Sequence, residues 1–377
     1  MRQAIERQAA TQAQAGGMHG MPDPLGGDGL FAVSTPKLDL RQAQALAAEV
    51  YGIDSRATVL SSERDQNFRL DGRDGGTYVL KVTHPAEDPG VTDFQTQAQL
   101  HLMRAQPALP VPGILPTRSG ESIHWREVGA GGLRQAVRLI TFLPGVPLYK
   151  VARSARQRQA LGGALARFDQ ALAGFSHAHS NHRLLWDIQH VSQLRPLLAL
   201  VEDGPRRALA TQFLDHYEQA TAQRVAGLRR QVIHNDLNAY NVLVDEHDTE
   251  RVTAILDFGD MVEAPLVNDL AVACAYQLAD APDPLATALD CVRAYHRVLP
   301  LTEAEAGVLP DLIAARLLIT VLITGWRARQ HPENSAYILR NNALSWTGLH
   351  RLAALPRGQA EHTVLEAIGG EPENHHE

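Results

Sequence analysis

The spacing of hydrophobic residues predicts a small lobe of strands in the first part of the chain. At 38–51 apolar residues recur every three to four positions, which indicates an amphipathic helix capped by Asp39. A second helical pattern covers 91–104. Alternating or apolar runs predict strands at residues 57–61, 67–70, 77–82, 122–128 and 135–143. The turns DGRDGG and GAGG join strand pairs, so we expect antiparallel hairpins beside one main helix.

Beyond Pro144 and Gly145 the pattern becomes mostly helical. Strand-like pieces interrupt it at 242–244 and 252–255. We therefore expect an α+β protein with a hinge at this Pro-Gly pair. The expected parts are a disordered N-terminal segment at 1–33, a sheet lobe at 34–143, a helical lobe at 144–356 and a disordered tail at 357–377. Whether the terminal segments belong to a larger fusion is left open.

Composition and charge narrow the class of protein. The 377 residues carry a formal net charge of -7, which argues against a nucleic-acid partner. Cys274 and Cys291 lie in apolar helical patterns, which fits a reducing cytoplasm. The most apolar run, 313–323, is broken by Arg316 and is too short to span a membrane, so we expect no membrane partner. The oligomeric state is not determined by these features.

The stretch VIHNDLNAYNVLVD (232–245) carries the chemistry. Asp236 and Asn241 follow the order H-x-D-x-x-x-x-N, and Asp257 ends the apolar run of AILDFGD further on. Phosphoryl transfer needs a carboxylate beside the attacking hydroxyl, together with oxygen ligands that hold Mg²⁺ on the phosphates. We expect Asp236 to be the catalytic carboxylate and Asn241 and Asp257 to be the metal ligands. Asp269 is expected to brace this loop by accepting its backbone amides.

This segment resembles the catalytic core of the aminoglycoside phosphotransferase and choline kinase superfamily, small-molecule kinases with a bilobal, protein-kinase-like fold. The resemblance implies ATP or GTP as co-substrate and Mg²⁺ as metal. It also implies that Lys81, which ends the strand TYVLKV, lies on the nucleotide phosphates. The polar loop SSERDQNF replaces a glycine-rich loop, and we expect Ser62, Asp65 and Asn67 to contact the phosphates.

The helix after Lys81 has no glutamate in the position where such kinases pair one with this lysine. Asp93 and Gln95 are the two candidates for the role, and the sequence does not choose between them.

Five motifs resemble the hydroxylysine kinase branch more narrowly: SERDQNF, the helix start DFQ, HNDLNAYN, LLWDI and PENSAYILRNNALSW. They imply a kinase that phosphorylates 5-hydroxy-L-lysine. Homoserine, choline-like and aminoglycoside acceptors are the alternatives within the same chemistry. An interaction module that binds nucleotide without catalysis is the alternative of another class, and retention of the catalytic residues argues against it.

Trp186, Asp187 and Glu263 are the candidates for contact with the acceptor. An acid next to an aromatic residue suits an ammonium group, although a buried tryptophan and a helix-capping aspartate explain Trp186 and Asp187 equally well. A hydroxylysine-like acceptor also needs one cation for its carboxylate. The histidines of SHAHSNH match no zinc-ligand spacing, and we expect them to lie in a polar loop.

Overall fold

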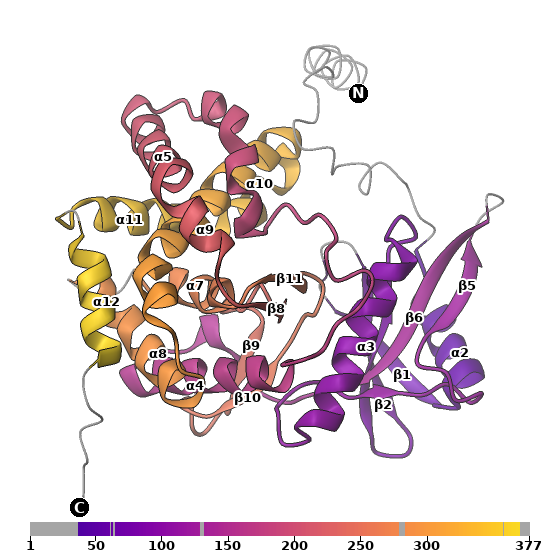
Figure 1. Cartoon of the computed structure of the whole chain (residues 1–377). Helices are drawn as coiled ribbons and strands as arrows, with labels where there is room; N and C mark the ends of the chain where they lie inside the picture. Colours follow the sequence, from indigo (N-terminus) through magenta and orange to yellow (C-terminus); the bar gives the residue numbers. More distant parts are fainter. Residues whose placement is uncertain are drawn as a thin grey trace, which may run out of the picture.

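The computed structural model describes residues 37–60, 62, 65–128, 132–278, 283–356 and 358–369. It forms a small lobe built on a sheet and a larger helical lobe, as Figure 1 shows. The segment 1–33 and most of the GAGG turn lie outside the described residues. The predicted α+β class, with a sheet lobe followed by a helical lobe, is confirmed.

Six antiparallel strands make the sheet of the small lobe, in the order β1-β2-β3-β6-β4, with β5 also paired to β6. The strands are β1 Ser55–Leu60, β2 Gln66–Gly72, β3 Thr77–Val82, β4 Ile114–Leu115, β5 His124–Val128 and β6 Leu133–Thr141. Their bounds agree with the predicted runs to within about two residues, and β4 is an additional two-residue strand.

Two helical segments cover one face of this sheet. Helix α2 (Leu40–Leu46) begins at Asp39, whose side chain accepts the amide of Gln42 in a capping box, so the predicted cap is confirmed. It continues into the π-helical turn η2 (Ala47–Tyr51). Both pack on the apolar residues of β2, β3 and β6 to form the core of the lobe. Alternation along each strand therefore sends the polar residues, Lys81 among them, to the opposite face.

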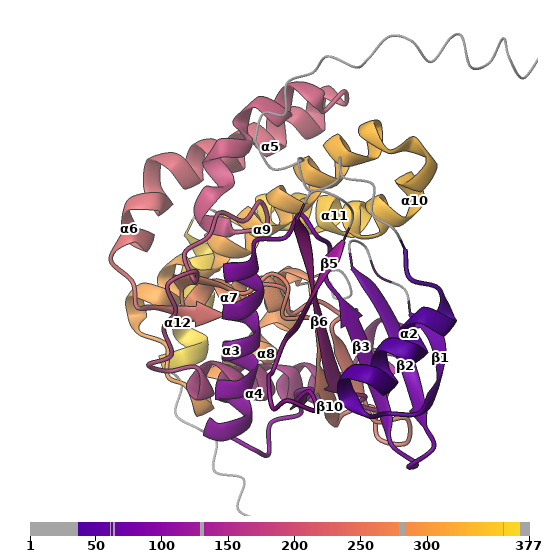
Figure 2. The ribbon, with the colours of Figure 1, turned by 90° about the vertical axis from the view of Figure 1, so that its right-hand side faces the viewer.

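Helix α3 (Pro89–Ala105) lies between the sheet and the helical lobe, as Figure 2 shows. Its buried residues include Phe94, Ala98 and Leu102, which belong to the core of the larger lobe. The helix therefore joins the lobe that carries Lys81 to the lobe that carries the catalytic loop.

The chain enters the helical lobe through the Pro144-Gly145 pair. Gly145 has a φ of 150°, and a Cβ there would lie 2.5 Å from Thr253 Oγ1 and 2.8 Å from the carbonyl oxygen of Val244. Only glycine lets the chain pass this close to the strands below it.

Two small antiparallel sheets lie at the front of the helical lobe, of three and two strands. The three-stranded sheet contains the predicted strands β9 (Val242–Val244) and β10 (Val252–Ile255), with β7 (Val146–Pro147) at the edge. The two-stranded sheet pairs β8 (Arg230–Ile233) with β11 (Val262–Pro265), neither of which the sequence pattern predicted.

Helices make up the rest of the lobe around one large core. They are η3 Leu148–Lys150, α4 Ala155–Ala171, η4 Ile188–Leu200, α5 Gly204–His216, η5 Tyr217–Thr221, α6 Ala222–Ala226, α7 Val267–Ala275, α8 Pro284–Val298, α9 Glu303–Gln330, η6 Pro332–Asn334, α10 Ser335–Ile338, η7 Leu339–Asn341, α11 Asn342–Ala353 and α12 Gln359–Gly369.

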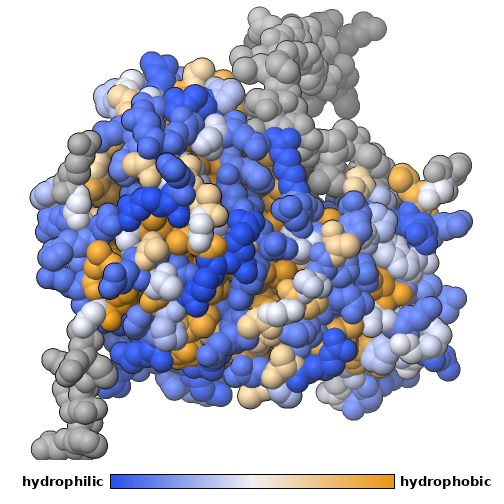
Figure 3. Space-filling model, viewed as in Figure 1, coloured by the Kyte–Doolittle hydropathy of each residue, from blue (hydrophilic) through white to orange (hydrophobic). Residues whose placement is uncertain are grey.

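Helix α9 corrects one expectation from the sequence. It runs for 28 residues and is long and apolar enough to cross a bilayer, so the argument that the apolar run is too short is wrong. Burial explains its composition instead, because 94% of its most apolar window lies inside the protein. On the face shown in Figure 3, hydrophilic residues cover most of the surface and hydrophobic ones form small separate groups. Helix α9 is thus the central core helix of the lobe.

The C-terminal region differs from a second expectation from the sequence. Residues 357–377 were expected to be disordered, but Gln359–Gly369 form α12, which packs against α8 and α9. Val364 is 1% exposed, and Glu361 pairs with Arg224 at 2.7 Å. The apolar residues of this segment recur at helical spacing, and burial of that stripe outweighs its polar composition.

Candidate active site

The catalytic loop lies between β8 and β9, and Asp269 of α7 holds its start. The backbone amides of His234 and Asn235 donate to the two carboxylate oxygens of Asp269, each at 2.8 Å. Asn235 has a φ of 64°, a left-handed conformation that asparagine tolerates better than most residues. The prediction that Asp269 braces the loop is confirmed.

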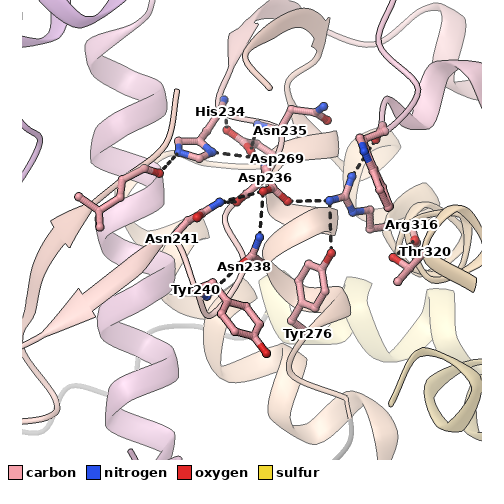
Figure 4. Close-up of polar contacts among 12 residues, drawn as sticks. His234, Asn235, Asp236, Asn238, Tyr240, Asn241, Asp269, Tyr276, Arg316 and Thr320 are labelled. Carbon is pink, nitrogen blue, oxygen red and sulfur yellow. Dashed lines mark hydrogen bonds and ion pairs between the residues drawn. The ribbon is translucent and has the colours of Figure 1, made fainter. Parts of the chain in front are cut away.

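Asp236 lies at the centre of the loop and accepts hydrogen bonds on both carboxylate oxygens (Figure 4). Oδ2 accepts from Nδ2 of Asn238 at 2.9 Å and from Nδ2 of Asn241 at 2.8 Å. Oδ1 accepts from an amino group of Arg316 at 2.7 Å. Burial raises the pKa of Asp236 to about 7, and the charge of Arg316 opposes that rise. A fixed carboxylate with a pKa near neutrality is suited to accept a proton from an alcohol.

Arg316 approaches Asp236 from the side opposite Asn241 (Figure 4). It projects from α9, is 2% exposed, and also donates to the backbone oxygen of Trp186 at 2.7 Å and to the hydroxyl of Tyr276 at 3.2 Å. Sequence reasoning missed this residue. The available signal was a single charge inside the apolar run 313–323, because such a charge needs a buried partner.

Asn241 and Asp257 are neighbours at one end of the β9–β10 hairpin. Val242 pairs with Ile255, and the amide of Leu256 donates to the backbone oxygen of Asn241 at 2.8 Å. His234 also contacts this hairpin end, with Nε2 3.0 Å from the backbone oxygen of Leu256. The structure therefore brings together the two residues that the sequence predicts to hold a metal.

The oxygen atoms of these two side chains are suitable ligands for Mg²⁺. The amide nitrogen of Asn241 donates to Asp236, so its Oδ1 is left as an acceptor. Asp257 is exposed, and its φ of 63° is a strained conformation of the kind found at functional sites. The described residues contain no group of three or more His, Cys, Asp or Glu side chains able to hold a metal. One carboxylate and one amide match the way Mg²⁺ binds, with phosphates and water completing its shell.

Lys81 lies on the inner face of the sheet of the small lobe. In the strand register it faces Asn67 on β2 and Arg138 on β6, so the three side chains share this face. Oδ1 of Asn67 is buried without a hydrogen-bond partner in the described part of the chain. Asp65 accepts the amide of His84 at 3.1 Å, and Ser62 is exposed.

Neither candidate from α3 contacts Lys81. The side-chain amide of Gln95 donates to the backbone oxygen of Gly259 at 3.1 Å, and Asp93 lies 3.2 Å from Nε2 of His177. Both residues instead tie α3 to the helical lobe. The sequence left open whether Asp93 or Gln95 pairs with Lys81, and in the structure neither residue does.

Arg138 is the buried group beside Lys81. It is 5% exposed and donates to the hydroxyls of Thr96 on α3 and Thr83, at 3.3 and 3.4 Å. Burial lowers the pKa of Arg138, and the charges of Asp65 and Asp257 oppose this effect. The inner face of the sheet therefore carries two cations, Lys81 and Arg138. Strand periodicity alone did not single out this arginine.

The three residues predicted to contact the acceptor have different surroundings in the structure. Asp187 caps η4: it is 1% exposed, and its two oxygens accept from the amide and the side chain of Gln189 at 2.9 and 2.8 Å. The structure therefore favours the alternative that the sequence left open, a buried helix cap, over a contact of Asp187 with the acceptor. Trp186 lies over Arg316, 5.5 Å from ring centre to guanidinium carbon. Glu263 is half-buried and accepts from Ser180 at 2.9 Å.

The histidines of SHAHSNH pack around α3. The ring of His177 lies 5.6 Å from the ring of Phe94, and His182 lies 6.0 Å from the same ring. His179 covers Gly90, where a Cβ would lie 2.1 Å from its imidazole. These contacts attach the N-terminal half of α3 to the helical lobe.

A sequence model of the phosphotransferase enzyme family (APH) matches residues 56–308. The chain belongs to this family. This match spans both lobes and includes Lys81, Asp236, Asn241 and Asp257.

Curated relatives lie within the same phosphotransferase family of small-molecule kinases. A hydroxylysine kinase of Danio rerio is 27% identical over 337 residues, covering 87% of this chain and 95% of the relative. A homoserine kinase of Cupriavidus necator is 28% identical over 290 residues, covering 74% of this chain and 79% of the relative. The structure of amicoumacin kinase hAmiN, in complex with AMP-PNP and Ca²⁺, aligns with a TM-score of 0.61 at 16% identity, covering 82% of this chain and 93% of that one. The chain is thus a family phosphotransferase that acts on small molecules, with the kinase-like fold.

Proposed function

We propose that this phosphotransferase moves the γ-phosphoryl group of ATP or GTP to the hydroxyl of 5-hydroxy-L-lysine. The observation that carries the proposal is Asp236, held at 2.7–2.9 Å by Arg316, Asn238 and Asn241. A carboxylate fixed in this way is placed to orient an alcohol and take its proton as the phosphoryl group transfers.

The other site residues have complementary roles in this proposal. Asn241 and Asp257 hold Mg²⁺, which neutralises charge on the phosphates. Lys81 contacts the phosphates directly, and Ser62, Asp65 and Asn67 line the loop above them. The small lobe, 34–143, thus binds the nucleotide, and the helical lobe, 144–356, supplies catalysis and the acceptor pocket.

The choice of acceptor rests on the relatives. The hydroxylysine kinase of Danio rerio is matched over 95% of its length and 87% of this chain, whereas the homoserine kinase of Cupriavidus necator is matched over 79% of its length and 74% of this chain. Homoserine is the second candidate, because its kinases are equally similar where they align. Glu263, half-buried beside the loop of Ser180, and Trp186, above Arg316, are the proposed contacts for the amino groups of the acceptor. The buried free thiols Cys274 and Cys291 fit a cytoplasmic location.

An acceptor panel tests the proposal. Nucleoside diphosphate release is measured with 5-hydroxy-L-lysine, L-homoserine, choline and kanamycin, once with ATP and once with GTP. We expect the highest kcat/KM with 5-hydroxy-L-lysine. A higher value with homoserine would replace the acceptor but keep the reaction, and no acceptor-dependent release with any compound would contradict the proposed function.

A further inference from the structure

Two arginines approach the catalytic loop from the C-terminal part of the helical lobe, and only one has a carboxylate partner. Arg316 is fully buried and paired with Asp236 at 2.7 Å. Arg340, in η7, is half-buried and has no carboxylate within ion-pair distance in the described part of the chain. Its recorded hydrogen bond goes to the backbone oxygen of Tyr337 at 3.3 Å, and its Nε is buried without a partner.

Two tyrosine rings lie against the guanidinium of Arg340. Its Cζ lies 3.9 Å from the ring centre of Tyr337 and 4.7 Å from that of Tyr240. Tyr240 in turn stacks on Tyr149 at 4.4 Å. Stacking fixes the plane of the guanidinium and leaves its in-plane donors to other partners. These rings therefore orient the side chain, and the described part of the chain offers it no carboxylate partner.

This stack belongs to the catalytic site. Tyr240 is part of the loop that carries Asp236 and Asn241, and its amide donates to Oδ1 of Asn238 at 2.7 Å. The segment of Arg340 is anchored to α9 by Asn342, which donates to the hydroxyl of Thr324 at 2.9 Å.

Thr324 lies on the same face of α9 as Arg316, the partner of the Asp236 carboxylate. Thr324 bonds to the backbone oxygen of Thr320, and Thr320 bonds to that of Arg316. Eight residues of helix, from the partner of Asp236 to the anchor, span about 12 Å. The side chain of Arg340 and a small acceptor molecule can together span a distance of this length.

We propose that Arg340 binds the carboxylate of the acceptor and so selects amino acids over simple amino alcohols. The inference rests on the proposed function, because it concerns the acceptor of that reaction. A planar guanidinium matches a carboxylate with two parallel hydrogen bonds, which a point charge does not. Tyr240 and Tyr337 partly desolvate the pair, which strengthens the attraction between the charges. Arg316 does not take this role, because it is 2% exposed and both of its amino groups already donate, to Asp236, Trp186 and Tyr276.

The test compares 5-hydroxy-L-lysine with its decarboxylated counterpart, 1,5-diaminopentan-2-ol, in the wild type, R340Q and R329Q. Arg329 is the matched control. It lies in the last turn of α9 and pairs with Glu202 at 2.8 Å, away from the catalytic loop. We expect the wild type and R329Q to favour the carboxylated acceptor. R340Q should raise the KM for 5-hydroxy-L-lysine at least tenfold while leaving the KM for the diamine and for the nucleotide unchanged. R340K should restore only part of the loss.

The outcomes separate the inference from the function it rests on. Equal kcat/KM of the wild type for both acceptors, or an unchanged KM for 5-hydroxy-L-lysine in R340Q, overturns the role of Arg340 and leaves the kinase intact. A rise of KM for both acceptors alike also overturns it, because the effect would then not depend on the carboxylate. Failure of the wild type to phosphorylate either compound overturns the proposed acceptor, and the inference with it.

Discussion

Asp257 combines the carboxylate that we propose as a Mg²⁺ ligand with an unfavourable backbone conformation. Its φ of 63° lies in the left-handed region, where most side chains are strained by roughly 1–2 kcal/mol and asparagine and aspartate are tolerated best. Alanine is therefore a poor probe here, since it removes the carboxylate and adds strain. Asparagine keeps the shape and the backbone and removes only the charge.

We predict that D257N lowers phosphoryl transfer by at least about 100-fold, because a metal ligand that neutralises phosphate charge is lost. Its melting temperature should stay close to that of the wild type, since Asp257 is exposed. Steady-state assays over a Mg²⁺ titration check this. Normal turnover of D257N at saturating Mg²⁺ would show that the metal is held elsewhere.

Site residues could be predicted from the sequence when their partners lie close to them in the chain, and not when the partners are distant. Asp236 and Asn241 share one loop, and Asp257 lies at the end of the hairpin that follows, so local spacing was sufficient to find them. Arg316 reaches Asp236 from 80 residues away, and only the packing of α9 brings them together. The sequence left two roles open for Asp187 because a helix cap and an ammonium site use the same residue types, and only burial and hydrogen bonds distinguish them.

At the scale of elements, strands with a clear alternation were predicted and short ones were not. Strand β11 has four residues, ends at Pro265 and is buried beside β8, so its pattern differs little from a loop. Helix α12 was missed because its polar residues were read as disorder, whereas its apolar stripe packs on α8 and α9.

Helices α4 and α8 meet at a glycine, which gives a test of their packing. A Cβ on Gly162 would lie 2.2 Å from the backbone oxygen of Cys291, whereas a Cβ on its neighbour Gly163 would meet only the flexible end of Arg167, at 3.5 Å. We predict that G162A lowers the free energy of unfolding by about 1–3 kcal/mol. G163A should leave it unchanged or raise it by up to about 1 kcal/mol, because alanine favours a helix. Urea denaturation of both variants measures this, and equal effects would contradict the close contact.

A buried acid links α4, α7 and α8 behind the catalytic loop. Asp169 is 0% exposed and accepts from the hydroxyl of Tyr295 at 2.6 Å, and its Oδ1 has no partner in the described part of the chain. Burial, reinforced by the charge of Asp269, raises the pKa of Asp169 well above its usual value. The folded protein therefore favours the protonated form. Its stability falls as the pH rises from the unfolded pKa, about 3.9, through the raised folded one.

Asparagine at this position keeps the acceptor for Tyr295 and cannot ionise. We predict that D169N is no more stable than the wild type near pH 4 but is more stable by about 1–2 kcal/mol near pH 8. Thermal unfolding across this range checks the sign. A stability difference that does not change with pH would mean that Asp169 is ionised in the folded state at all these values.

For the whole molecule, the two lobes are joined by more than the Pro144-Gly145 pair. Helix α3 packs in the core of the helical lobe through Phe94, and Gln95 bonds to the backbone of Gly259, two residues after Asp257, the proposed metal ligand. This places Lys81 and Asp257 in one connected framework. We therefore propose one phosphoryl-transfer site assembled from both lobes, with Asp236 at its centre.

The most direct measurement of that claim is the acceptor-dependent rate of nucleoside diphosphate release by D236N, with 5-hydroxy-L-lysine and saturating nucleotide and Mg²⁺. Nucleotide binding by the same sample shows that the variant is folded, which matters because the charge of Arg316 loses its partner. We predict intact nucleotide binding and a kcat at least about 100-fold below that of the wild type, the usual effect of losing a general base. A folded D236N that keeps a kcat within about tenfold of the wild type would contradict the central role of Asp236.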